Sequence, residues 1–297
     1  MTAWERRQLR NGLLFASPWL LGFIGFALYP LIMSIYYSFT AFNVVQPPVW
    51  VGLDNYRELF LRDPLFWKAL YNTLYFTAFS VPLSLMFSLG LALLLNQKLP
   101  GISLFRTLFF LPSIVPIVAS AVLWLWVLNP DSGLINTLLR QWLGVEGPGW
   151  LADAHWSKPS LVLMSLWSVG GAMVIFLAGL TDVPQTLYEV AELDGAGPFN
   201  KFRHVTLPML TPTILFNLVM GLIMAFQYFT QVYVMTGGSG TPVDSTMFYA
   251  LYLYRNSFYY LRMGYASAMA WMLFIVILVA TLGVLYSSKR WVYYHGD

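Results

Sequence analysis

Residues 263–286 read MGYASAMAWMLFIVILVATLGVLY, an apolar run without Asp, Glu, Lys or Arg. A helix rises about 1.5 Å per residue, so about 20 apolar residues cross the hydrocarbon core of a bilayer, which is about 30 Å thick. The run is long enough for one crossing. It therefore predicts a membrane-spanning helix.

Five further runs of the same kind precede it. They are Leu13–Phe39, Asn72–Leu95, Thr107–Leu128, Ser160–Leu180 and Met209–Met235. Every ionisable side chain lies between the runs, as the cost of charge inside a bilayer requires. We expect an all-α polytopic membrane protein with six transmembrane helices over residues 13–286. Residues 1–12 and 287–297 are then an N-terminal segment and a C-terminal tail.

The composition supports a membrane protein. The chain has 297 residues, of which 58% are hydrophobic and 10% are charged, whereas soluble domains carry about 25% charged residues. Its Lys and Arg residues are dispersed without a basic stripe, which argues against nucleic-acid binding. The absence of cysteine excludes disulfides, thiolate metal sites and cysteine nucleophiles.

The distribution of basic residues favours both termini inside the cell. That orientation places nine Lys and Arg residues inside and seven outside, and the outside loops are longer and count less. The inside set is Arg6, Arg7, Arg10, Lys98, Arg106, Lys201, Arg203, Lys289 and Arg290. No cleavage site follows the first apolar run, so we expect it to be retained as a span.

The sequence offers no energy source or catalytic group of its own. No ionisable residue lies within the six runs, which argues against a proton relay but leaves sodium coupling open. No phosphate-binding loop with a Gly-Lys pair occurs, and His155, His204 and His295 lack metal-ligand spacing. We therefore expect no catalytic residues, no bound metal and no cofactor on this chain.

The segment 181–208, between the fourth and fifth runs, predicts a short helix–turn–helix. Thr181 or Asp182 can cap a first helix with Pro184 in its first turn, and Gly195 can end it in a left-handed conformation. Pro198 suits the start of a second helix to about Val205, and Leu207-Pro208 turns the chain back into the membrane.

The first predicted helix of this segment is amphipathic. Leu187, Val190 and Ala191 form an apolar side, and Glu189 and Glu192 form an acidic side. By physical argument alone, the segment is either a docking surface for a soluble partner or a solvated loop at the membrane surface.

The same segment resembles the signature loop of ABC-importer permeases. In that signature Glu-Ala-Ala is followed after three residues by Gly and, nine residues later, by Ile-x-Leu-Pro. This chain has Glu189-Val190-Ala191, Gly195 and Val205-Thr206-Leu207-Pro208 at the same spacing. Val190 and Val205 are the departures. Further segments are similar to maltose-type and glycerol-phosphate-type permeases: 29–40, 51–56, 105–112, 176–180, 234–238 and 264–268.

The resemblance implies a type I ABC-importer permease in the plasma (inner) membrane of a prokaryote. It implies a homologous second permease, two ATPase subunits that bind ATP and Mg, and an extracytoplasmic solute-binding protein as partners. The loop would dock as a coupling helix in a groove of an ATPase subunit. The residues carried over to that contact are Glu189, Val190, Ala191, Asp194, Gly195, Ala196, Leu207 and Pro208.

Polar and aromatic residues on the fifth run indicate a solute path. Asn217, Met224, Gln227, Tyr228 and Gln231 fall on one face of a continuous helix. Amides and aromatic rings suit a sugar or oligosaccharide, although Asn and Gln also hydrogen-bond between packed helices. Glycerol 3-phosphate, a stand-alone carrier or channel, and a membrane-embedded enzyme are the rival functions. An anion should need a basic group in the path, and the predicted spans contain none.

Overall fold

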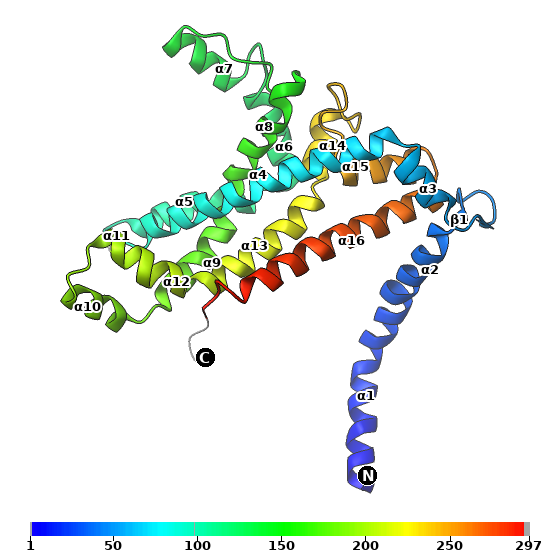
Figure 1. The fold of residues 1–297 in the computed structure, drawn as a ribbon, viewed down its shortest axis with the longest axis horizontal. Helices are drawn as coiled ribbons and strands as arrows, with labels where there is room; N and C mark the ends of the chain where they lie inside the picture. The colour runs from blue at the N-terminus through cyan, green and yellow to red at the C-terminus, as the bar shows by residue number, and fades with distance from the viewer. Residues whose placement is uncertain (1, 98, 294–297) are drawn as a thin grey trace. The chain divides into compact units, whose positions relative to one another are not determined.

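The computed structural model describes residues 2–97 and 99–293, so Lys98 and the end of the predicted tail, with His295, lie outside the described residues. The chain forms two compact units. The first contains the chain up to Asp63 together with Leu253–Met272, and the second contains Pro64–Tyr252 together with the chain from Leu273. Each unit is described by itself (Figure 1).

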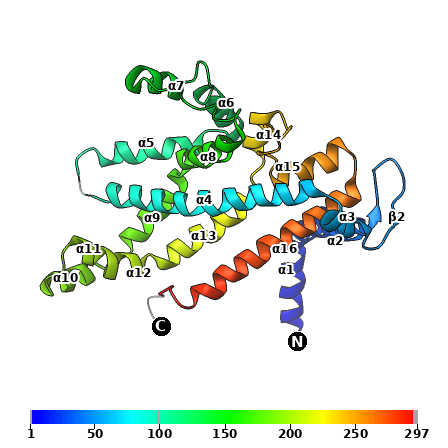
Figure 2. The same ribbon diagram turned by 45° about the horizontal axis from the view of Figure 1, so that its top comes forward.

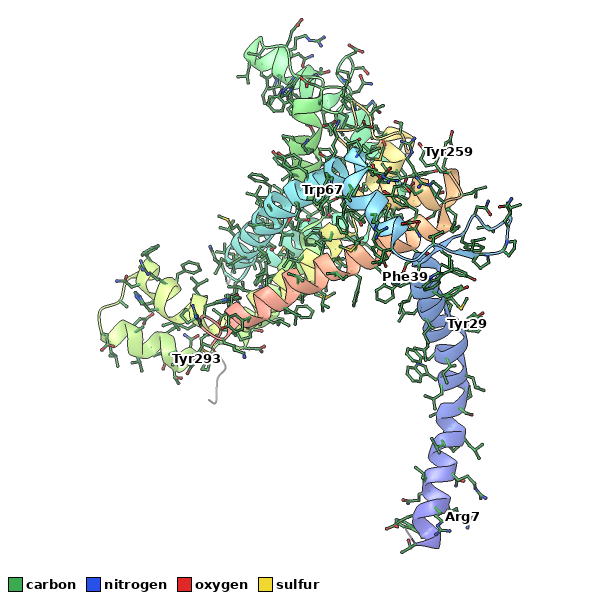
Figure 3. The ribbon with its side chains drawn as sticks, turned by 45° about the vertical axis from the view of Figure 1, so that its right-hand side comes forward. Arg7, Tyr29, Phe39, Trp67, Tyr259 and Tyr293 are labelled. Carbon is green, nitrogen blue, oxygen red and sulfur yellow. The ribbon has the colours of Figure 1, made fainter. Side chains whose placement is uncertain are left out.

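The first unit begins with one long helical stretch. It comprises α1 (Ala3–Phe23), a π-helical turn η1 (Ile24–Leu28) and α2 (Tyr29–Ser38). Thr2 caps it through a capping box with Glu5, and Pro18 lies inside the helix without breaking it. Tyr29 and Phe39, labelled in Figure 3, lie on α2 and directly after its end.

Buried polar contacts hold the rest of this unit together. A two-stranded antiparallel sheet, β1 (Thr40–Ala41) and β2 (Val49–Trp50), leads into α3 (Asp54–Leu61). Asn55 donates to the carbonyls of Ser38 and Thr40, both at 2.9 Å. The chain returns through η5 (Arg255–Tyr259) to α16 (Met263–Ser288). The amide of Gly264 donates to the carbonyl of Phe42 at 3.0 Å.

The second unit is built around the long helix α4 (Pro64–Leu95), which packs against α8, α9 and α13. Figure 2 shows α4 between α5 and α13. The helices of this unit outside the 181–208 loop also include the part of α16 from Leu273, and α5 (Ile102–Ile114), α6 (Ile117–Val127), α7 (Leu134–Leu138), η2 (Leu139–Leu143), α8 (Ala154–Ser165), η3 (Leu166–Ser168), α9 (Gly170–Thr181), α13 (Thr211–Phe226) and α14 (Thr230–Thr236). A further helix, α15 (Tyr249–Tyr254), precedes η5.

An apolar cluster joins α4, α9 and the turn before α13. It contains Leu91, Ala92, Leu95, Val169, Met173, Phe176, Leu177, Leu180 and Leu210. The last carbonyl of α4, that of Leu95, accepts two hydrogen bonds from the guanidinium of Arg106, at 3.0 and 2.7 Å. That contact satisfies an acceptor that every helix C-terminus leaves open.

The described residues contain four helices long and apolar enough to cross a membrane, or six spans if each of two bent helix pairs counts as one. This confirms the all-α class. The third predicted span is sharply bent, because α5 and α6 meet at 98°. Val115 is extended there (φ −64°, ψ 131°), as a residue before proline prefers, and Pro116 follows it. The fourth span bends by 48° between η3 and α9.

The fifth span is also interrupted, because α13 ends at Phe226 and α14 begins at Thr230. The tail after α16 is partly fixed, since the amide of Tyr293 donates to Thr211 Oγ1 at 2.9 Å near the start of α13 (Figure 3).

The loop that follows α14 is fastened to α4 by side-chain hydrogen bonds, and Lys158 of α8 joins the same network. Asn72, 1% exposed, donates to the carbonyls of Asp244 (2.9 Å) and Met247 (3.0 Å). Lys158 Nζ donates to Asn72 Oδ1 at 3.3 Å. Lys68 Nζ donates to the carbonyl of Val243 at 2.6 Å. These contacts make Asn72 the central member of the network.

Candidate functional site

A cavity of about 520 Å³ lies in the second unit, between α4, α6, η3, α9, α13 and α14. Clefts that hold small molecules typically measure about 300–1,000 Å³. Hydroxyl and amide side chains from several helices contribute to its wall. They are Ser80, Ser84, Ser120, Ser165, Ser168, Asn217, Tyr228 and Gln231. Apolar groups such as Phe76, Val81 and Met220 complete it.

Several of these polar groups have hydrogen-bonding capacity left. Asn217 Nδ2 donates a hydrogen bond to the carbonyl of Thr213 at 2.9 Å. Among the described residues, none donates a hydrogen bond to Asn217 Oδ1. Gln231 makes no side-chain hydrogen bond to the described residues. The Tyr228 hydroxyl is buried and has no partner among them. Buried polar groups are normally satisfied, so this hydroxyl calls for water or a ligand.

Tyr228 belongs to an aromatic cluster at one end of the cavity. Its ring stacks on Phe76 with centroids 4.3 Å apart, and Phe248 packs edge-on against both rings. Phe76 and Tyr228 line the cavity, so the cluster offers ring faces and edges to a bound molecule.

The predicted stripe on the fifth span is only partly assembled. Asn217, Met224, Tyr228 and Gln231 line the cavity, and Gln227 does not. The assumption of one continuous helix is wrong, because the break after Phe226 ends the helical face before Gln227. A role of these residues in solute binding stays a prediction.

The cavity wall carries no formal charge. Among the described residues that line it there is no Asp, Glu, Lys, Arg or His. The nearby cation of Lys158 is instead engaged with Asn72 and lies 5.7–5.8 Å from the ring centroids of Tyr71 and Tyr75.

The 181–208 loop is the second candidate site, and it forms the predicted helical hairpin. Its elements are α10 (Gln185–Leu193), α11 (Pro198–Lys201), the π-helical turn η4 (Phe202–Thr206) and α12 (Leu207–Met209). Figure 1 shows α10 and α11 folded back on each other. Gly195 has φ +75° and ends α10, and Pro198 begins α11, as predicted.

The structure corrects two details of this loop. Pro184 itself is the N-cap of α10, with ψ 129°, and makes no side-chain capping bond; Thr181 instead donates to the carbonyl of Ala178. Leu207 and Pro208 do not turn the chain, because they continue the helical backbone from η4 into α12.

The exposed face of α10 is both acidic and apolar. None of its residues is buried, and within the described chain the carboxylate of Glu189 forms no ion pair. Val190 is 57% exposed, Leu193 88% and Phe199 70%. Sequence reasoning missed Leu193 and Phe199. Their signal was a large apolar side chain on each side of the glycine turn in an otherwise polar loop.

The remaining predicted loop residues surround the turn or anchor it. Asp194 and Gly195 are exposed, and Ala191 and Ala196 are half-buried. The amide of Ala196 donates to the carbonyl of Ala191 at 2.8 Å, which closes the turn. Leu207 and Pro208 are half-buried beside Leu210, a member of the apolar cluster.

Residues 80–293, which include the 181–208 loop and every lining residue of the cavity except Phe76, match the family described as binding-protein-dependent transport system inner membrane component. The chain belongs to this family. It is thus an inner-membrane permease subunit of an ABC transporter and not an enzyme, which confirms the resemblance seen in the sequence.

The similarity to known relatives and to a solved structure extends over nearly the whole chain. The permease is 41% identical to the probable ABC transporter permease protein YesP of Bacillus subtilis (strain 168), over 97% of this chain and 94% of that one. It is 33% identical to the lactose transport system permease protein LacF of Rhizobium radiobacter, over 94% of each. A chain of a bacterial alginate ABC transporter, in complex with alginate pentasaccharide-bound periplasmic protein, superposes with a TM-score of 0.82 at 25% identity, covering 97% of each chain.

Proposed function

We propose that this permease forms half of the import pathway for a neutral sugar or oligosaccharide. The observation that carries the proposal is the 520 Å³ cavity with hydroxyl, amide and aromatic walls and no charged side chain. Sugar hydroxyls need donors and acceptors, and the apolar faces of sugars stack on rings. The lactose permease LacF and the transporter of the acidic polysaccharide alginate support a saccharide as cargo, while the absence of charge in the proposed sugar rests on the cavity wall alone.

The uncharged wall disfavours an anion such as glycerol 3-phosphate. Moving a phosphate into an uncharged cavity would leave its charge without a compensating cation, which is costly away from water. Lys158 does not line the cavity, so the wall itself offers no cation to that charge.

We propose further that the 181–208 loop is cytoplasmic and docks into an ATPase subunit. The free carboxylate of Glu189 and the exposed Val190, Leu193 and Phe199 support this assignment, since large exposed apolar side chains in a polar loop mark an interaction site. Two ATPase copies would bind ATP and Mg, and a homologous permease would complete the pathway. An extracytoplasmic binding protein would deliver the solute, and both termini would be cytoplasmic.

Substitution Glu189→Lys tests the docking assignment. A reversed charge in the contact should reduce ATP-driven uptake by about tenfold, which corresponds to about 1.4 kcal/mol, while the protein still inserts. Uptake is measured in vesicles that contain the complete transporter, with a mixture of lactose, trehalose and maltotriose followed by mass spectrometry. Thr186→Val, on the same helix and exposed, is the control. Normal uptake by the Glu189→Lys protein would show that Glu189 does not contribute to docking with an ATPase subunit.

The double substitution Asn217→Leu with Gln231→Leu tests the solute path. Both amides line the cavity, and leucine removes their hydrogen bonds at similar volume. We expect sugar uptake to fall by about tenfold or more while ATP hydrolysis continues, because two hydrogen bonds to a bound hydroxyl contribute roughly 1–3 kcal/mol together. Unchanged uptake kinetics would limit the two amides to helix packing.

A further inference from the structure

The 181–208 loop is tied across its two helices by side-chain contacts that the signature motif does not include. The Tyr188 hydroxyl on α10 shares a hydrogen bond of 2.9 Å with Thr206 Oγ1 at the end of η4. Thr206 is 5% exposed, so water does not compete easily for this bond. Lys201 Nζ and Glu192 Oε1 form a second contact at 2.5 Å, but the Glu192 side chain is 63% exposed, so solvent weakens it.

The Thr206 end of this tie leads directly to the cavity. From η4 the backbone stays helical through α12 to Leu210, which is fully buried in the apolar cluster. The amide of Ile214 in α13 then donates to the carbonyl of Leu210 at 2.9 Å. One turn further, Asn217 lines the cavity and donates to the carbonyl of Thr213. A displacement of η4 is therefore passed along continuous hydrogen-bonded structure to the cavity wall.

The two helices that enter and leave the loop are in close contact near it. A Cβ at Gly179 of α9 would lie 2.8 Å from Thr213 Oγ1 and 3.0 Å from Leu210 Cδ2 of the helical segments that follow the loop. Both helices contribute to the cavity wall, through Ile175 on α9 and Asn217 on α13. Helices packed this closely must move together.

By contrast, α10 has little other support. None of its residues is buried, and its remaining attachments are the exposed Glu192–Lys201 pair and the connection to α9 through Thr181–Pro184, which is not helical beyond Thr181 and holds the buried Val183. Without the Tyr188–Thr206 bond, α10 could swing about this connection and about the Gly195 turn. Motion imposed on α10 would then be lost before it reached η4.

We propose that Tyr188 and Thr206 are positioning residues, which make the loop one rigid lever and transmit motion of a docked ATPase to the cavity. This inference rests on the proposed docking of the loop. It assigns to Tyr188 a role separate from binding: the loop should still dock without the bond but should no longer move α13.

The test follows the cavity itself and needs no known solute. Because the sequence has no cysteine, Met220→Cys places one thiol on α13 in the cavity wall. The complete transporter in nanodiscs is treated with a water-soluble maleimide, with and without ATP and vanadate. Trapping the nucleotide state should change the labelling rate by about fivefold or more, as expected for a shift between two populated states.

Tyr188→Phe and Thr206→Val each remove one partner of the bond and keep the shape; Thr206→Val also removes a long bond of 3.4 Å from Thr206 Oγ1 to the carbonyl of Lys201, so Tyr188→Phe is the cleaner of the two. In each variant the nucleotide-dependent change should shrink to about twofold or less while ATP hydrolysis persists. The double variant should be no worse than either single one, because both remove the same interaction. Thr186→Val removes a hydroxyl from the same helix as Tyr188. Its nucleotide-dependent labelling should equal that of the protein that carries Met220→Cys alone.

Two results would overturn the inference. If Tyr188→Phe leaves the nucleotide-dependent change in the labelling rate of Met220→Cys unaltered, the bond does not transmit motion. Additive losses in the double variant would show that the two residues act separately. If ATPase subunits fail to co-purify with the unsubstituted chain, the proposed docking is wrong, and the inference about Tyr188 and Thr206 is then wrong too. Co-purification therefore distinguishes the two failures.

Discussion

Gly170→Ala should strongly destabilise the permease, although alanine normally favours a helix. A Cβ at Gly170 would lie 2.6 Å from the carbonyl oxygen of Phe109 and 2.8 Å from the Cα of Phe110, both backbone atoms of α5. Backbone cannot rotate away as a side chain can, so α5 and α9 must separate. Overpacking of this kind costs about 1–3 kcal/mol, and the separation would also disturb the adjacent cavity wall.

The neighbouring glycine provides a matched control. A Cβ at Gly171 meets nothing within 4 Å, so Gly171→Ala should gain up to about 1 kcal/mol of helix propensity without a clash. Thermal unfolding of the detergent-solubilised protein can be followed by tryptophan fluorescence. Relative to the unsubstituted protein, the unfolding midpoint should fall for Gly170→Ala and rise for Gly171→Ala. Equal midpoints would contradict the close contact between α5 and α9.

Asn72→Leu should have a comparable effect at the loop that follows α14. The substitution leaves the carbonyls of Asp244 and Met247 without their donor, and Lys158 without its acceptor. Each buried polar group left unpaired costs about 1–3 kcal/mol, so we expect a loss of roughly 3 kcal/mol. The loop should also become sensitive to protease, since two of its hydrogen bonds to α4 are gone.

The control lies on the same helix. Thr77 is 4% exposed and its hydroxyl has no partner among the described residues. Thr77→Val keeps the shape and removes an unsatisfied group, so it should leave the unfolding midpoint unchanged or raise it. Limited proteolysis and thermal unfolding of the two variants separate loss of the Asn72 contacts from a general effect of removing a polar group from α4.

Hydropathy predicted the helices well because each membrane-spanning segment must by itself be apolar, and this shows directly in the sequence. Charged residues are excluded from every run, whatever the neighbours of that run. Turn chemistry is also local, which is why Gly195 and Pro198 were correctly assigned in the loop. The family signature rests on the same local pattern.

The bend at Pro116 has a local cause, whereas the break before Thr230 depends on distant contacts and was not predictable in the same way. Pro18, Pro82 and Pro112 lie inside helices, whereas Pro116 follows a bend of 98°. The break before Thr230 contains neither Gly nor Pro. It occurs where Tyr228 stacks on Phe76 and meets Phe248 edge-on, and both partners come from other parts of the chain. Tertiary packing therefore accounts for this break, which moved Gln227 off the cavity wall.

The interruption at Gln227–Phe229 has a mechanical consequence. Regular helical hydrogen bonds are already missing there, so tilting α13 against α14 sacrifices few further bonds. Such a tilt would move Asn217 and Met220 on α13 relative to Gln231 on α14, and all three residues line the cavity. The cavity could therefore change shape without the unwinding of either helix.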